Sequence, residues 1–96
     1  MKESRLQKQI KKELEQTFGE AIVVYNIHGS QYQEAGIPDL LVCFKGYFVG
    51  LEIKTGSGYK ASEIQKYQMK RIQNSGGIAL VVESVEQALA VFTYLA

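Results

Sequence analysis

The stretch GIPDLLVCFKGYFVGLEIK, residues 36–54, predicts a β-hairpin. Two apolar runs flank the pair Lys45-Gly46, and a two-residue loop is the commonest connection between hairpin strands. With this pair as the turn, Asp39 faces Glu52 across the hairpin, and the Cβ atoms of such residues lie about 4.5–5.5 Å apart. Lys54 projects from the same face as Glu52, because side chains alternate along a strand. The sequence therefore predicts two carboxylates and a lysine together at one end of the hairpin.

The two facing carboxylates suggest a metal site. Like charges opposed in an otherwise apolar hairpin are costly unless a cation lies between them. Carboxylates, water and a substrate phosphate are typical ligands of Mg²⁺, and they also suit Mn²⁺. The cation would lower the pKa of a bound water, while Lys54 would hold that water or offset charge on a reacting phosphate. The alternative is an edge hairpin with solvated carboxylates that Lys54 bridges, and the spacing leaves both interpretations open.

Hydrophobic periodicity and turn residues divide the rest of the chain into further elements. Leu6, Ile10, Leu14 and Phe18 recur at helical spacing. The expected elements are a helix over 4–18, a strand over 21–27, a helix that opens at Ser62 and ends at Gly76-Gly77, a strand over 78–82 and a helix over 85–96. The order α-β-β-β-α-β-α is typical of an α/β fold, and the length fits one domain over residues 1–96.

Three serines are each followed three residues later by a glutamine, which is the pattern of a capping box at a helix N-terminus. The pairs are Ser4 with Gln7, Ser62 with Gln65, and Ser84 with Gln87. The helix after the third pair is apolar around much of its circumference. We therefore expect it to be deeply buried or to form half of a dimer contact.

The composition is ordinary for a folded protein, with 46% hydrophobic and 22% charged residues. No apolar run approaches the roughly 18 residues that a membrane helix needs. The N-terminal residues lack the apolar core of a secretory signal. The single cysteine, Cys43, excludes an internal disulfide and a zinc site built from a cysteine cluster. These features predict a cytoplasmic protein that has no membrane partner.

The net charge is only +1, but the basic residues concentrate in two segments. Residues 1–18 carry five basic and three acidic side chains, and residues 45–71 carry six basic and two acidic ones. If the fold brings these segments together, they would form a basic face for a polyanion. Solvated helix surfaces explain the same charges, so this alternative stays open.

Two short motifs resemble those of a known nuclease superfamily. GIPD at 36–39, followed by EIK at 52–54, resembles the PD-(D/E)xK motif. The stretches SEIQKYQ at 62–68 and SGGIALVV at 75–82 extend the similarity to the VRR-NUC family (virus-type replication-repair nucleases), especially its stand-alone phage and bacterial members. The resemblance covers essentially the whole chain. It implies a restriction-endonuclease-like αβββαβ core with a mixed sheet and an extra C-terminal helix.

The resemblance also implies a role for each motif residue. Asp39 and Glu52 would bind Mg²⁺ or Mn²⁺, with the backbone carbonyl oxygen of Ile53 as a further ligand. Lys54 would be the catalytic lysine.

Two residues on the predicted helices complete the implied site. Gln65 matches a glutamine that lies near the active site in the family, and its capping-box position gives it a structural role as an alternative. Glu3 is the acidic residue that would complete the metal shell. It extends the buried stripe of the first helix toward the core, although it precedes the proposed cap.

DNA contacts are expected from the lone histidine and from cations of the second basic segment. These residues are His28, Lys60, Lys66, Lys70 and Arg71. They would bind backbone phosphates, which position a nucleic acid without reading its sequence. The alternatives are a loop histidine without a catalytic role and a plain solvated helix face.

The sequence and the resemblance together predict a metal-dependent DNA endonuclease that hydrolyses phosphodiester bonds. The resemblance implies that it leaves a 5′-phosphate and a 3′-hydroxyl. A domain this small has no separate recognition module, so DNA shape would select the substrate. We expect a homodimer similar to a Holliday-junction resolvase, acting on branched or duplex DNA in a bacterial or phage-infected cytosol. The alternatives are a non-catalytic DNA-binding module with the same fold and a protein-interaction domain that uses the C-terminal helix.

Overall fold

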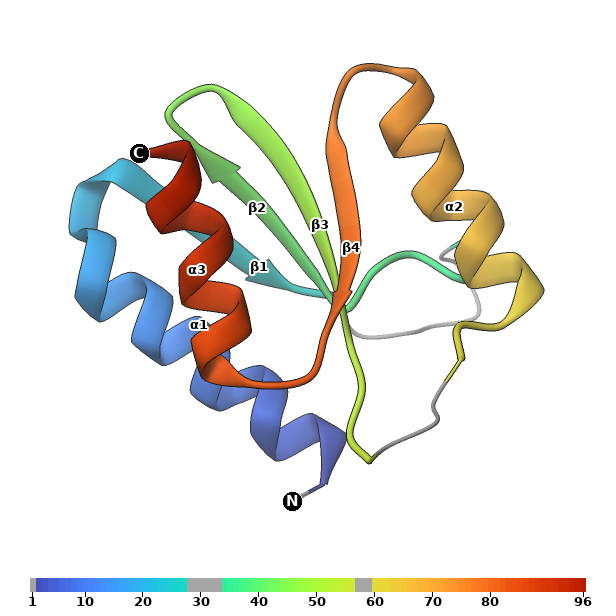
Figure 1. The fold of residues 1–96 in the computed structure, drawn as a ribbon, viewed down its shortest axis with the longest axis horizontal. Coiled ribbons are helices and arrows are strands. Elements are labelled where there is room, and N and C mark those ends of the chain that lie inside the picture. Colours follow the sequence, from blue (N-terminus) through green and yellow to red (C-terminus); the bar gives the residue numbers. More distant parts are fainter. Residues whose placement is uncertain (1, 28–33, 57–59) are drawn as a thin grey trace.

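The computed structural model describes residues 2–27, 34–56 and 60–96, which form an α/β fold (Figure 1). The elements are, in chain order, α1 (Glu3–Phe18), the short 3-10 helix η1 (Gly19–Ala21), β1 (Ile22–Asn26), β2 (Leu40–Phe44), β3 (Tyr47–Ile53), α2 (Glu63–Asn74), β4 (Ile78–Val82) and α3 (Val85–Leu95). This order confirms the α-β-β-β-α-β-α arrangement expected from the sequence. Within the described part of the chain, no helix combines the length and apolar character needed to cross a membrane.

The four strands form one mixed sheet in the order β1-β2-β3-β4. The pairs β1–β2 and β2–β3 are antiparallel, whereas β3 and β4 run parallel. A parallel pair needs a crossover connection, and α2 lies in that connection. The mixed sheet and the C-terminal helix confirm the predicted fold class.

The turn between β2 and β3 confirms the predicted hairpin register. Phe44 pairs with Tyr47, and Leu40 pairs with Leu51. The two turn residues, Lys45-Gly46, have φ angles of 50° and 87°. Two successive positive φ angles are the signature of a type I′ turn, whose twist matches that of the flanking strands. The turn therefore fixes which residues of β2 and β3 lie at the far end of the hairpin.

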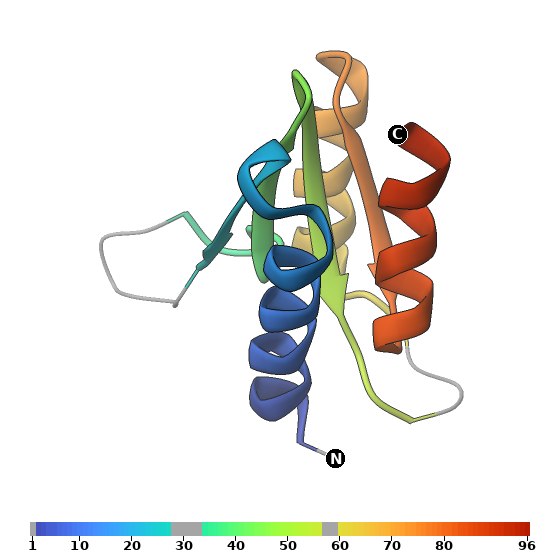
Figure 2. The same ribbon diagram turned by 90° about the vertical axis from the view of Figure 1, so that its left-hand side faces the viewer.

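Helices cover both faces of the sheet (Figures 1 and 2). On one face, α1 and α3 lie side by side and bury apolar stripes against the strands. The buried residues of these stripes are Leu6, Ile10 and Leu14 of α1, and Ala88 and Phe92 of α3. On the opposite face, α2 packs near β3 and β4, where its Ile72 approaches Gly50. The spacing of the stripes explains why these segments form helices, since residues four apart share one helix face.

Three aromatic rings join the helical layer to the sheet. Phe18, Phe44 and Phe92 meet edge-on, with ring centroids between 5.1 and 6.2 Å apart. Edge-to-face contacts of this kind add to the stabilisation from buried apolar area. The inward burial of Phe92 accounts for much of the apolar character of α3, although Tyr94 on the same helix is 88% exposed.

The first and third expected capping boxes differ from the pattern. The prediction for Ser4 is wrong, because α1 begins one residue earlier with Lys2 at its N-cap and no side-chain cap. At α3, the Ser84 hydroxyl accepts the N–H of Gln87 as expected. The Gln87 side chain, however, accepts the backbone N–H of Glu83 at 2.7 Å. The cap of α3 is therefore displaced by one residue from the standard box.

Candidate active site

The motif residues meet at one end of the sheet. Glu52 lies in β3, Lys54 follows directly after that strand, and Asp39 immediately precedes β2. Glu3 reaches this end from the start of α1, and Gln65 reaches it from the first turn of α2. Four separate segments of the chain thus contribute side chains to one small polar site beneath an apolar core.

Backbone hydrogen bonds and close packing hold Asp39 in place. The N–H of Ile27 donates to the Asp39 carbonyl oxygen, and the N–H of Ile53 donates to Asp39 Oδ2, each at 2.8 Å. Pro38 packs against Gly50 so closely that an added Cβ on the glycine would lie 2.9 Å from Pro38 Cγ. Gly50 therefore makes room for the proline that precedes the aspartate. The bond from Ile27 holds the Asp39 backbone, and the bond from Ile53 orients its carboxyl group.

Glu52 is a buried carboxyl, with only 1% of the residue exposed. Burial raises the pKa of Glu52 from 4.5 to about 7, and the negative charge of Asp39 adds to this effect. Lys54 acts in the opposite direction but does not overcome the burial. Close to neutral pH, the neutral and the charged form of Glu52 are therefore both populated. Any added cation would favour the charged form.

Lys54 is buried beside two carboxylates. Its Nζ lies 3.3 Å from Glu52 Oε2 and 3.5 Å from Glu3 Oε1. Its backbone N–H donates to the carbonyl oxygen of Val82 on β4, at 3.0 Å, which continues the ladder beyond the end of β3. The ammonium group is thereby held at the site by the sheet as well as by its charge partners.

Gln65 combines the two roles that the sequence left open. Its Oε1 accepts the backbone N–H of Ser62 at 2.9 Å, while the Ser62 hydroxyl accepts the N–H of Gln65, so the capping box of α2 is complete. Its Nε2 donates to Glu52 Oε2 at 2.9 Å. One side chain therefore both caps α2 and orients the buried carboxylate.

The oxygen atoms at this site fit a small divalent cation. Asp39 and Glu52 supply two adjacent carboxylates. Ile53, whose backbone N–H donates to Asp39 Oδ2, stands between Glu52 and Lys54 in the chain. Burial and the charge of Asp39 both raise the pKa of Glu52, and a cation between the two carboxylates would oppose this rise. The described residues contain no group of three His, Cys, Asp or Glu side chains arranged for a metal, and Glu3 lies against Lys54. Two carboxylates completed by water and phosphate are a common Mg²⁺ arrangement.

Solved structures share both this fold and its extent. One, described as a VRR_NUC domain, superposes with a TM-score of 0.76 and 27% identity, covering 98% of this chain and 97% of its own. The chain resembles this VRR_NUC domain over nearly its whole length. A second structure, described as a VRR_NUC domain protein, has a TM-score of 0.74 and 18% identity, and the match covers 98% and 87% of the two chains. No protein-family model and no curated protein matches the sequence.

The similarity to VRR_NUC domains suggests a nuclease-type domain. The cations expected to contact DNA differ in their surroundings. Lys60 and Lys70 are exposed, whereas Lys66 Nζ lies 3.4 Å from Glu63 Oε1. Arg71 Nη1 lies 3.1 Å from Glu34 Oε2. His28 lies outside the described residues. The contact of these side chains with DNA stays a prediction.

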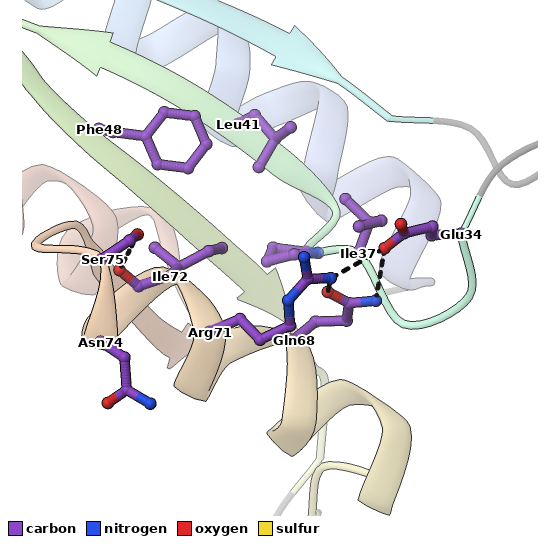
Figure 3. Close-up of a pocket in the computed structure, with 10 residues that line it drawn as sticks. Glu34, Ile37, Leu41, Phe48, Gln68, Arg71, Ile72, Asn74 and Ser75 are labelled. Carbon is purple, nitrogen blue, oxygen red and sulfur yellow. Dashed lines mark hydrogen bonds and ion pairs between the residues drawn. The ribbon is translucent and has the colours of Figure 1, made fainter.

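A polar network that no sequence motif indicated joins α2 to the segment before β2. Figure 3 shows Glu34, Gln68 and Arg71 directed toward one another at the rim of a groove of about 630 Å³. Gln68 Nε2 donates to Glu34 Oε2 and to the carbonyl oxygen of Ala35, both at 3.1 Å. The partners are more than 30 positions apart in the chain, so no local pattern could reveal them.

A matched pair of variants would separate the two roles of Gln65. Ser62→Ala should cost about 1 kcal/mol of stability through the lost cap and leave cleavage nearly unchanged. Gln65→Ala should lose similar stability and also weaken the apparent Mg²⁺ affinity about tenfold, because Glu52 loses an orienting donor. Thermal unfolding and a Mg²⁺ titration of the cleavage rate would measure both effects. Equal Mg²⁺ dependence in the two variants would show that Gln65 only caps the helix.

Proposed function

We propose that this domain is a divalent-metal-dependent DNA endonuclease that hydrolyses phosphodiester bonds. The observation that carries the proposal is the buried Glu52 carboxyl beside Asp39, with the Lys54 ammonium 3.3 Å away. Burying the Glu52 carboxyl beside a second acid destabilises the fold, and Lys54 alone does not offset the rise in the pKa of Glu52. A purely structural hairpin would not need this costly pair of acids, whereas a catalytic cation site would require it.

The residues of this chain would divide the work between binding and positioning. When bound, Mg²⁺ or Mn²⁺ supplies positive charge to the phosphate and lowers the pKa of a coordinated water. Asp39 and Glu52 would hold the cation, with the Ile53 carbonyl oxygen as a further ligand. The Lys54 ammonium would donate to the attacking water or to a phosphate oxygen whose negative charge grows during the reaction. Gln65 would keep Glu52 in the orientation for binding.

We further propose a homodimer that selects branched DNA, as a resolvase of four-way junctions does. A two-fold axis relating two active sites suits a junction with near two-fold symmetry. The exposed apolar residues of the sheet favour β3 and its neighbours as the contact surface. Val23 is 46% exposed and Phe48 is 48% exposed, and the strand register places Cys43 between them. The helix α3 is less suited, because Ala88 and Phe92 already face the core.

A cleavage assay tests the proposal directly. The wild-type protein would be incubated with a labelled four-way junction and a duplex of the same sequence, in Mg²⁺, Mn²⁺ or EDTA. We expect paired cuts in the junction that EDTA and the Glu52→Gln substitution both remove. Equal cutting of the duplex would keep the nuclease and refute the structural selectivity. DNA binding without cleavage in any metal would favour a non-catalytic module, and a monomer in light scattering at micromolar concentration would refute the dimer.

A further inference from the structure

The helix α1 carries a concentration of positive charge on the side that faces β1. Three lysines of the helix and the last residue of β1 line a concave surface of about 330 Å³, which we name the lysine pocket. Its residues are Lys8, Lys11, Lys12, Glu15 and Asn26. The lysines share one side of α1 because residues three and four apart lie on the same helix face. With three cations and one carboxylate, the pocket favours an anion.

The opposite side of α1 has the reverse character. There α1 and the start of α3 form a second groove, of about 620 Å³. Its charged residues are Glu13, Glu83 and Glu86, and none of its described lining residues is basic. A polyanion approaching α1 would therefore be repelled beside α3 and attracted beside β1, so the two sides of one helix define a direction of approach.

Lys11 forms a fixed part of the lysine pocket. Its Nζ donates to the carbonyl oxygen of Val24 at 2.8 Å, and it lies 3.1 Å from Glu15 Oε2. Lys11 thus covers a free carbonyl on the edge strand and takes up the only carboxylate of the pocket. Among the described residues, neither Lys8 nor Lys12 has an ion-pair partner, so their ammonium groups are available to a ligand.

Asn26 adds an independent sign of a missing partner. Its Oδ1 is buried and has no hydrogen-bond partner among the described residues. Buried polar atoms are nearly always hydrogen-bonded, so an unpaired acceptor such as this one is expected to receive a hydrogen bond from a further donor. A lysine ammonium has three N–H donors, so it can donate to Asn26 Oδ1 and to an anion at the same time.

The lysine pocket lies close in the fold to the active site. Asn26 is the last residue of β1 and pairs with Leu40, and the next residue, Ile27, donates its N–H to Asp39. Toward its N-terminus, beyond Lys8, α1 starts at Glu3, which lies 3.5 Å from Lys54 Nζ. The pocket and the carboxylate pair therefore flank the same end of the sheet.

From this arrangement we propose that the lysine pocket binds a backbone phosphate of the DNA, next to the phosphate held at the active site. The inference rests on the proposed function and extends it by naming the side from which the strand enters. It assigns a contact with the DNA backbone to Lys8 and Lys12 of α1. Two of the three cations of α2 are less free, because Lys66 and Arg71 each lie within 3.4 Å of a glutamate, whereas Lys70 is exposed.

The test compares lysine variants at two ends of the molecule. Lys12→Ala and Lys8→Ala/Lys12→Ala remove charge from the pocket, and Lys45→Ala removes one charge from the β2–β3 turn at the opposite end of the hairpin. Fluorescence anisotropy would measure binding to a labelled junction in EDTA across a range of salt concentrations. One phosphate contact contributes about 0.9 to the slope of log affinity against log salt. We expect the double variant to lower the slope by about one and to weaken binding about tenfold at low salt, while Lys45→Ala has little effect.

The outcomes separate this inference from the proposed function. If the wild type binds and cleaves DNA, but Lys12→Ala and the double variant behave like Lys45→Ala, the lysine pocket is not a phosphate site and the nuclease proposal stands. If the wild type does not bind DNA, both proposals are wrong. Thermal unfolding of each variant controls for misfolding, and an unchanged midpoint is expected because Lys8 and Lys12 are exposed.

Discussion

Glu52→Gln should abolish cleavage and, at the same time, stabilise the metal-free protein at pH 8. The loss of activity is expected to exceed about a thousandfold, because a neutral amide replaces one of two charged metal ligands. The gain in stability follows from the burial that raises the pKa of Glu52 to about 7. Glutamine has nearly the same shape, and its Oε1 can still accept the hydrogen bond that Gln65 Nε2 donates to Glu52 Oε2.

The sign of this effect depends on which state holds the Glu52 proton more tightly. The folded state does, because the pKa is about 7 there against 4.5 for an ordinary glutamate. The contribution to stability is therefore complete below about pH 4.5 and is lost as the pH rises toward 7. The loss amounts to at most about 3 kcal/mol. Glutamine does not ionise, so the variant should keep most of this stability at pH 8.

Urea unfolding at pH 5 and pH 8, in EDTA, would measure the effect. The wild type should lose more stability between these pH values than Glu52→Gln does. Added Mg²⁺ should restore the wild type at pH 8, since a ligand that binds only the folded state stabilises it, and it should not affect the variant. The same pH dependence of stability in both proteins would contradict the conclusion that burial raises the pKa of Glu52.

The hairpin shows how much of the site a sequence can predict. The turn at Lys45-Gly46 sets the register, and this register brings Asp39 and Glu52 to the same end of the sheet. The prediction succeeded because the information is local: a short turn and two alternating strands specify every pair between them. Gln65 was also predictable as a cap, because the capping box spans only four residues.

Contacts between distant segments could not be predicted in the same way. The Glu3 side chain contacts Lys54, which is distant in the sequence. The helix α1 starts at Glu3, whereas the local pattern at Ser4 predicts a different N-cap. The bond from Lys11 to the Val24 carbonyl oxygen likewise depends on how α1 lies against the edge strand. Such contacts follow from the way whole helices and strands pack together. The spacing of apolar residues shows which face of each element is buried, but it does not show which residues of other elements that face contacts.

Lys54→Ala should lower the cleavage rate by about a hundredfold to ten-thousandfold and also destabilise the metal-free protein at pH 8. The rate falls because the ammonium no longer donates to the reacting groups. Stability falls because Lys54 lowers the pKa of Glu52, so its removal leaves this buried acid beside Asp39 without its cation. Lys45→Ala is the matched control, since that exposed lysine lies in the β2–β3 turn, at the opposite end of the hairpin from the site.

A double-mutant cycle with Glu52→Gln would show whether Lys54 acts through the buried acid. In the wild type, Lys54→Ala should cost about 1–3 kcal/mol at pH 8, because it removes the partner of a buried charge. In the Glu52→Gln background the same change should cost clearly less, because the amide needs no counter-charge. Equal costs in both backgrounds would mean that Lys54 stabilises the fold through Glu3 or through packing. Its effect on cleavage would then have to arise from direct contact with the substrate.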